Sequence, residues 1–235
     1  METFDQFIYE LGSSGQLLDR QKIAQFKAYL NEIKRANDTI GLVSKNDLDR
    51  MPSRHFMDSL MPVVLDVCSL DGSILDIGSG AGFPGIPLAM ILVNSNFYLV
   101  EANRRKSTFL RHVIRTLRIK NATVQSCRVE ALRGIKSSAR YDMVVSRAVS
   151  SVEQLTIWAS DVLKNHGRLI CYKGANPENE ISQAALTMKT KGMVLDDICS
   201  YNKSDSASPT LVILKKIIVN KNSSSCVSYG PNSPT

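Results

Sequence analysis

The sequence has few of the residues that hold metal ions or build disulfide frameworks. Its 235 residues include three histidines and five cysteines, and no two cysteines are spaced as C-x-x-C. Scattered cysteines in odd number argue against a disulfide scaffold, and isolated histidines argue against a zinc site. We therefore expect no metal centre and a reducing compartment, the cytoplasm.

Long apolar runs are also missing. The longest one, residues 86–93, contains Pro87 and is far shorter than the ~20 apolar residues that cross a bilayer. The first residues, Met-Glu-Thr-Phe-Asp-Gln, lack the basic-then-apolar order of a signal peptide. No internal repeat is visible. We expect no membrane association, and the apolar content of 43% is ordinary for a globular protein with a full core.

The net charge of +7 is placed unevenly along the chain. Residues 104–147 hold twelve Lys and Arg against two acids, whereas the rest of the chain has a slight acidic excess. Such clustering is typical of a face that binds a polyanion, although a solvated basic helix gives the same pattern.

Residues 73–92 carry the most informative pattern. A short apolar run that includes Asp76 leads into four closely spaced glycines, and a second apolar run follows. This order predicts a buried strand, a glycine turn and the start of a helix. Glycine lets a ligand approach the main chain, and the free N–H groups of the helix start add a slightly positive rim.

Two kinds of cofactor use such a turn. Gly80-x-Gly82-x-x-Gly85 matches the dinucleotide fingerprint, and Glu101 follows at the distance of a ribose-binding acid. The same stretch also reads acid-x-Gly-x-Gly-x-Gly from Asp76, as in motif I of methyltransferases that use S-adenosylmethionine (SAM). We favour SAM because the first glycine after the strand is Gly78 and because a carboxylate suits a cationic cofactor. A structural turn without a ligand is the remaining alternative.

The chain divides into three regions by pattern. We expect a helical region over residues 1–66, an α/β domain over 67–219 and a disordered tail over 220–235. Asp19 is the expected N-cap of a helix over 21–35, followed by an irregular connection over 37–46. Strands are predicted at 73–77, 96–100, 122–126, 142–145, 168–172, 194–200 and 210–219. Crossover helices are predicted from about residue 84 and over 104–117, 151–163 and 177–189. The last two strands have no helix between them, so they should pair as a hairpin.

Several motifs together resemble one family, the bacterial small-subunit rRNA guanine-N7 methyltransferases (RsmG, also called GidB), over about residues 21–216. The matching stretches are Arg54-His55-x-x-Asp58-Ser59-Leu60, Asp76-Ile-Gly-Ser-Gly-Ala-Gly-Phe-Pro-Gly-Ile-Pro87, Arg128-Val129-Glu130, Ser146-Arg147-Ala148 and Tyr172-Lys173-Gly174. The resemblance implies a class I SAM-dependent methyltransferase: a Rossmann-like seven-stranded sheet with a C-terminal antiparallel hairpin and an N-terminal helical extension. It implies a methyl group placed on guanine N7 of 16S rRNA, with SAM as cofactor and rRNA as partner. We expect a monomer.

The resemblance also implies a set of site residues. SAM contacts are expected at Gly78, Phe83, Val129, Glu130 and Arg147, and the loop residues Asp76 and Gly80 belong to the same site. From its place at the end of a strand, Glu101 is expected to accept the ribose hydroxyls. Arg147 and Lys173 end adjacent strands and are the expected catalytic residues. Candidates for RNA contacts are Arg54, His55 and Asp58, with Asp58 orienting the other two, and the basic-helix residues Arg111, Arg115 and Arg118.

The chemistry of this reaction needs no general base. Guanine N7 has a free lone pair and no proton, so the enzyme mainly aligns N7 with the methyl group. One family run, Trp-Asn-x-x-x-Asn-Leu-Thr, is altered here to residues 36–43, Ala-Asn-Asp-Thr-Ile-Gly-Leu-Val. That stretch bears on how the N-terminal helices dock or meet RNA. A SAM-dependent enzyme with another substrate and a non-catalytic RNA-binding assembly module are the alternatives.

Overall fold

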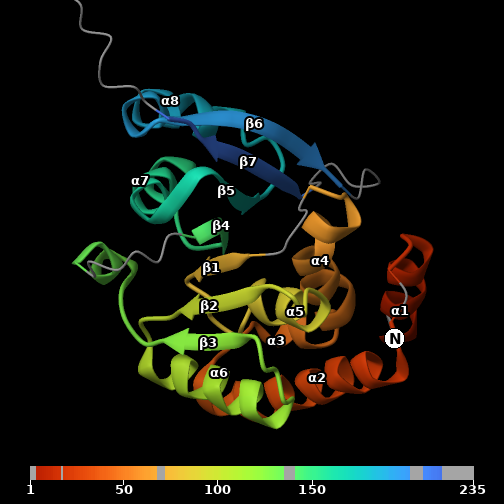
Figure 1. The fold of residues 1–235 in the computed structure, drawn as a ribbon. Coiled ribbons are helices and arrows are strands. Elements are labelled where there is room, and N and C mark those ends of the chain that lie inside the picture. The colour runs from red at the N-terminus through yellow and green to blue at the C-terminus, as the bar shows by residue number, and fades with distance from the viewer. Residues whose placement is uncertain (1–3, 17, 68–71, 135–140, 202–208, 219–235) are drawn as a thin grey trace, which may run out of the picture.

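The computed structural model describes residues 4–16, 18–67, 72–134, 141–201 and 209–218. Within these ranges the fold is a seven-stranded sheet of order β3-β2-β1-β4-β5-β7-β6 with helices on both faces (Figure 1). The tail predicted to be disordered, residues 220–235, lies outside the described residues.

The sheet is parallel except at β7, as the sequence predicts. β1 (Ser73–Ile77) lies between β2 (Asn96–Val100) and β4 (Tyr141–Arg147), and β3 (Ala122–Gln125) pairs with β2. β5 (Leu163–Lys173) pairs with β4 and, on its other side, with the antiparallel β7 (Thr210–Lys216), which forms the predicted hairpin with β6 (Met193–Ser200). The strand order therefore reverses between β1 and β4, and open α/β sheets bind ligands beyond the carboxyl ends of their strands at such a point.

Successive side chains of each strand point to opposite faces of the sheet, so the buried residues form two apolar clusters, one on each face. Ile74 of β1 packs with α5 (Gly85–Ile91) and α6 (Arg104–Thr116). Leu75 and Ile77 pack on the other face with α7 (Val152–Val162) and α8 (Glu178–Lys191). The short 3₁₀ helix η2 (Val129–Gly134) follows β3 on that second face.

The N-terminal region is helical, but its connection is shorter than predicted. It contains α1 (Phe4–Ser13), α2 (Arg20–Ile40), α3 (Lys45–Leu48), the π-helix η1 (Met51–Phe56) and α4 (Met57–Val64). Asp19 caps α2 as expected, accepting the Lys22 N–H at 2.7 Å. The irregular connection predicted over 37–46 is confined to residues 41–44, because α2 continues to Ile40 and α3 begins at Lys45.

Asn37 explains this extension of α2. Its buried side-chain amide accepts the N–H groups of Leu42 and Val43 and donates to the carbonyl of Val43. These bonds replace the helical partners that the chain loses at Gly41, which takes the left-handed conformation with φ of 67°. The altered family run therefore keeps one Asn that organises the helix end.

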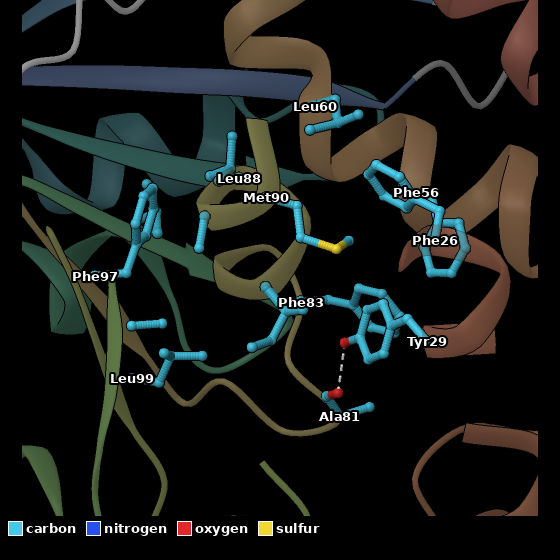
Figure 2. Packing of buried hydrophobic residues seen from close by; sticks show 14 of the residues in the cluster. Phe26, Tyr29, Phe56, Leu60, Ala81, Phe83, Leu88, Met90, Phe97 and Leu99 are labelled. Atoms are coloured by element: carbon cyan, nitrogen blue, oxygen red, sulfur yellow. Dashed lines mark hydrogen bonds between the residues drawn. The ribbon is translucent and has the colours of Figure 1, made fainter. Parts of the chain in front are cut away.

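Aromatic side chains join the N-terminal helices to the sheet. Tyr29 of α2 stacks on Phe56 with ring centroids 5.5 Å apart and lies 5.7 Å from Phe83, next to the glycine turn. Figure 2 shows this cluster, in which the Tyr29 hydroxyl donates to the carbonyl of Ala81 at 2.7 Å. The N-terminal helices therefore dock on the sheet through these rings, in a chain that lacks the Trp of the family run.

Candidate active site

The turn after β1 has the backbone geometry that its glycines permit. Gly78 and Gly82 have φ of 71° and 110°, in the left-handed region that disfavours other residues. A Cβ at Gly78 would meet the side chain of Val149, and one at Gly82 would meet the Tyr29 hydroxyl. The turn is therefore held closely by α2 on one side and by the chain after β4 on the other.

A cavity of about 580 Å³ opens beyond the carboxyl ends of β1, β2 and β4. Its size falls in the range of about 300–1,000 Å³ that is usual for small-molecule sites. Eight of the residues predicted from the sequence line it together: Gly78, Gly80, Phe83, Glu101, Val129, Glu130, Arg147 and His55.

Glu101 is fixed at the end of β2 by two main-chain bonds. One carboxylate oxygen accepts the N–H of Gly80 at 2.8 Å and the other accepts the N–H of Asn103 at 2.7 Å. A carboxylate has about four lone-pair sites, so each oxygen keeps acceptor capacity for a ligand. The arrangement ties the glycine turn to β2 and presents a nearly buried anion to the cavity.

Asp76 does not line the cavity, which corrects the prediction that it faces the cofactor. Its side chain is fully buried beneath the turn, where Oδ2 accepts the N–H of Gly85 at 3.1 Å. Burial raises the pKa of this carboxyl to about 7, more than its bonds to Ser79 and Gly85 lower it. Asp76 therefore holds the first turn of α5 against β1.

Arg147 lies at the centre of a polar network in the cavity wall. Its guanidinium donates to Nδ1 of His55 at 3.0 Å and lies 3.5 Å from the Asp58 carboxylate. Since arginine has no acceptor, His55 must carry its proton on Nε2. The imidazole in turn stacks on Phe83 with ring centroids 5.0 Å apart. This network links the last residue of β4 to η1 and to the glycine turn.

Burial and neighbouring charge set the protonation of this network. Burial, followed by the charge of Arg147, lowers the pKa of His55 to about 4, so the ring is neutral at physiological pH. Burial also raises the pKa of Asp58 to about 6, although Arg147 opposes the shift. This network thus holds one permanent cation, Arg147, beside a neutral imidazole and a carboxyl that titrates in the acidic range.

Two of the predicted RNA contacts have different neighbours from those expected. Arg54 is exposed and pairs with Asp47 at 3.0 Å, on the far side of His55 from Arg147. Asp47, whose carboxylate also lies 3.9 Å from Nε2 of His55, is thus the acid beside Arg54 and His55. Asp58 pairs instead with Arg147, so the prediction that it orients Arg54 and His55 is corrected.

Lys173 does not reach the cavity, which corrects its expected position beside the target base. Its ammonium donates to the carbonyl of Ser150 and to the Glu180 carboxylate, both at 2.7 Å. The same Glu180 oxygen accepts the N–H of Val152 at 3.1 Å. Lys173 therefore ties the chain after β4 to the start of α8.

The three basic-helix candidates do not share one face. Arg111 and Arg115 lie on α6 and line a groove beside α2, whereas Arg118 follows the helix with φ of 55° and lines another hollow. The helical pattern predicted over 104–117, carried on to the next residue, places Arg118 on the same outward face as Arg111 and Arg115. α6 ends at Thr116, and the chain turns there.

Several cavity residues had no clear signal in the sequence. Leu42 and Val43 enter from the end of α2, Lys106 from the first turn of α6, and Cys127 and Trp158 from the second face. Only Leu42 and Val43 fall in a stretch that the motif comparison had singled out. The others depend on the direction in which a side chain points, and apolar periodicity does not give this.

Two other kinds of feature, a metal-ion cluster and a membrane-spanning helix, are absent from the described ranges. Among the residues that the structure describes, no group of three or more His, Cys, Asp or Glu could hold a metal ion. No described helix is both long and apolar enough to cross a membrane.

The sheet order, the hairpin and the cavity beyond β1 define a class I SAM-dependent methyltransferase fold. Two solved structures share it: a proposed O-methyltransferase of Klebsiella pneumoniae and M. jannaschii TYW2 in complex with AdoMet. The first has a TM-score of 0.58 at 12% identity and covers 91% of this chain and 97% of its own. The second has a TM-score of 0.53 at 14% identity and covers 75% and 78%.

The family follows from sequence. Residues 22–208 match the GidB family, described as rRNA small subunit methyltransferase G, and this chain belongs to that family. A relative, ribosomal RNA small subunit methyltransferase G of Roseiflexus sp. (strain RS-1), is 32% identical over 204 residues. The match covers 86% of this chain and 87% of the relative.

Proposed function

We propose that this protein transfers a methyl group from SAM to N7 of a guanine in small-subunit (16S) rRNA. The observation that carries the proposal is the cavity lined by the glycine turn, Glu101 and Arg147 in a chain of the GidB family. An enzyme with this substrate would work in the cytoplasm, where ribosomes are made.

The lining of the cavity fits SAM. Glu101 would accept the ribose hydroxyls, and the glycine turn around Gly78, which lines the cavity, would let the methionine part approach the main chain. Val129 and Trp158 offer apolar surface to the adenine, with Glu130 beside them. The nearby carboxylates also suit a cationic sulfonium better than they suit a pyrophosphate.

The reaction asks the protein to position rather than to move protons. SAM supplies an electrophilic methyl group, and guanine N7 supplies a lone pair. Arg147, the cation held by His55 and Asp58 in the wall, would donate to guanine O6 or to a phosphate, leaving the N7 lone pair free. His55 and Asp58 hold the guanidinium in place. Because the base must leave its stack to reach the cavity, the substrate is an exposed or flipped guanine.

Calorimetry and a methylation assay test the proposal together. The protein should bind SAM and not NAD, and should transfer labelled methyl from SAM to 16S rRNA that lacks the modification. Chemical strand scission at N7-methylguanine should then mark one position. Binding of NAD without SAM, or transfer to other substrates only, would reject the proposal. Arg147→Ala should abolish transfer with a wild-type melting curve, and full activity would remove Arg147 from the site.

A further inference from the structure

A second large hollow runs between α2 and α6, outside the candidate active site. It has a volume of about 1200 Å³. The two helices pack side by side beneath β3 (Figure 1). One bond crosses between them, from His112 of α6 to the Glu32 carboxylate at 2.9 Å. We call this hollow the α2–α6 groove.

The lining of the groove divides by exposure into an apolar floor and a cationic rim. Ala36, Ile40 and Phe109 are buried or half-buried, which places them at the floor. The rim consists of exposed arginines: Arg35, Arg104, Arg105, Arg111 and Arg115.

Glu32, the acid in this lining, does not neutralise the positive charge of the rim. Its side chain is 14% exposed and is paired with His112 at 2.9 Å and with Arg35 at 3.3 Å. The groove therefore presents positive charge around an apolar surface. A polyanion whose units carry flat apolar faces matches both properties.

Residues close together in the chain line the groove and the cavity, both on α2 and on α6. On α2, Thr39 and Ile40 line the groove, and Leu42 and Val43, just after the helix, line the cavity. On α6, Arg104 and Arg105 line the groove, and the next residue, Lys106, lines the cavity. A strand lying in the groove would thus be led to the mouth of the cavity.

We propose that the α2–α6 groove binds a single-stranded RNA segment adjacent to the methylated guanine, with phosphates on the arginines and a base on the apolar floor. The inference rests on the proposed function and adds the path by which the substrate enters. The strand must be single, because bases within a duplex are stacked and only unstacked ones can lie on an apolar floor.

Charge removal inside and outside the groove tests the proposal. The double variant Arg111→Ala/Arg115→Ala removes two rim cations. The matched control, Lys34→Ala/Lys189→Ala, removes two exposed cations of α2 and α8 that lie outside the groove lining. Binding of unmodified 16S rRNA is measured against salt concentration, with SAM affinity measured in parallel. The groove variant should flatten the slope of log K against log salt by about 1.4, since each single-strand phosphate contact contributes about 0.7. The control should bind RNA as the wild type does.

A bulky uncharged substitution tests whether RNA occupies the groove itself, independently of the charge of its rim. Thr39→Trp places bulk at the cavity end of the groove, and Asn31→Trp adds the same bulk at an exposed position of α2 outside it. Thr39→Trp should raise the KM for RNA severalfold with SAM affinity unchanged, whereas Asn31→Trp should leave both unchanged. Melting curves verify that all four variants are folded.

Three results would overturn the proposal. The first is an equal loss of RNA affinity in the groove variant and its charge control. The second is an unchanged KM for RNA in Thr39→Trp. The third is a groove variant that fails only on assembled subunits and not on naked RNA, because the groove would then hold a protein. If the wild type itself transfers no methyl group to rRNA, the proposed function fails rather than the groove.

Discussion

At the scale of single residues, burial shifts the pKa values of Asp58 and Asp76 more strongly than their polar neighbours do. The carboxyl of Asp76 has one bonded oxygen and one, Oδ1, without a partner, and its pKa rises to about 7. Asp58 faces Arg147, yet its pKa still rises, to about 6. The free energy needed to remove a carboxylate from water exceeds the stabilisation that a single polar or charged neighbour provides.

The raised pKa of Asp76 predicts a stability that depends on pH. Its contribution is fully present below the ordinary pKa of about 3.8 and is lost as the pH rises towards 7, since only the folded state then holds the proton. The upper limit of this loss is about 4 kcal/mol. The side-chain amide of Asp76→Asn does not titrate, and one of its polar atoms lacks a hydrogen-bond partner. The variant should therefore be less stable than the wild type at pH 4, and this difference should disappear by pH 7. Melting temperatures from pH 4 to 8 measure this, and parallel curves for the two proteins would contradict it.

The sequence predicts cavity residues well where the backbone alone decides their position. Gly78 and Glu101 come directly after β1 and β2, and Arg147 ends β4; the ends of neighbouring parallel strands must meet at one edge of the sheet. It fails for Lys173, which ends β5, and for Asp76, which lies within β1. Their side chains turn towards Glu180 and Gly85, partners that no local pattern indicates.

At the scale of elements, β1 and β2 are predicted better than the helix ends and better than β5, which begins at Leu163 rather than at 168. Buried parallel strands are short apolar runs, so β1 and β2 have the predicted bounds. The end of α2 depends on Asn37 bonding to residues beyond the helix, and η1 depends on packing of its buried face. Such tertiary contacts override local propensity.

The hydroxyl of Tyr29 connects α2 to the glycine turn, and its removal should weaken both stability and SAM binding. Tyr29→Phe leaves the buried carbonyl of Ala81 without this donor, which costs about 1–3 kcal/mol. The turn should then hold SAM less tightly. Denaturant unfolding and calorimetry measure the two effects. Tyr9→Phe, at a residue 75% exposed on α1, is the matched control and should change neither. Equal behaviour of the two variants would contradict the link.

The bridge from β5 to α8 predicts that Lys173 acts as a positioning residue. Lys173→Met and Glu180→Gln should lower kcat by similar factors, because each loosens the chain around Ser150 and Val152. The double variant should be no worse than either single one, with a coupling of about 1 kcal/mol in stability. If Lys173→Met abolishes transfer while Glu180→Gln is fully active, Lys173 contacts the substrate after all.

At the scale of the whole molecule, one apolar cluster crosses the predicted boundary between an N-terminal region (1–66) and a methyltransferase domain (67–219). Phe26 and Tyr29 of α2, Phe56 of η1, and Phe83 of the glycine turn belong to it (Figure 2). The cavity crosses the same boundary, since Leu42, Val43 and His55 line it together with residues of the sheet. The N-terminal helices thus contribute both to the core and to the site.

This shared cluster predicts that residues 45–235 alone do not form a SAM-binding protein. Each fully buried apolar side chain contributes about 1.5–3 kcal/mol, so losing Phe7, Phe26, Tyr29 and Ile33 costs about as much as a domain's whole stability of 5–15 kcal/mol. The truncated chain should lack a cooperative melt and should not bind SAM in calorimetry. Phe26→Ala in the full chain, which should fold and lose about 3–5 kcal/mol, tests the same cluster without truncation. A truncated chain that melts cooperatively and binds SAM as the full chain does would establish that residues 45–235 fold independently, because the core on the sheet would then be complete without α2.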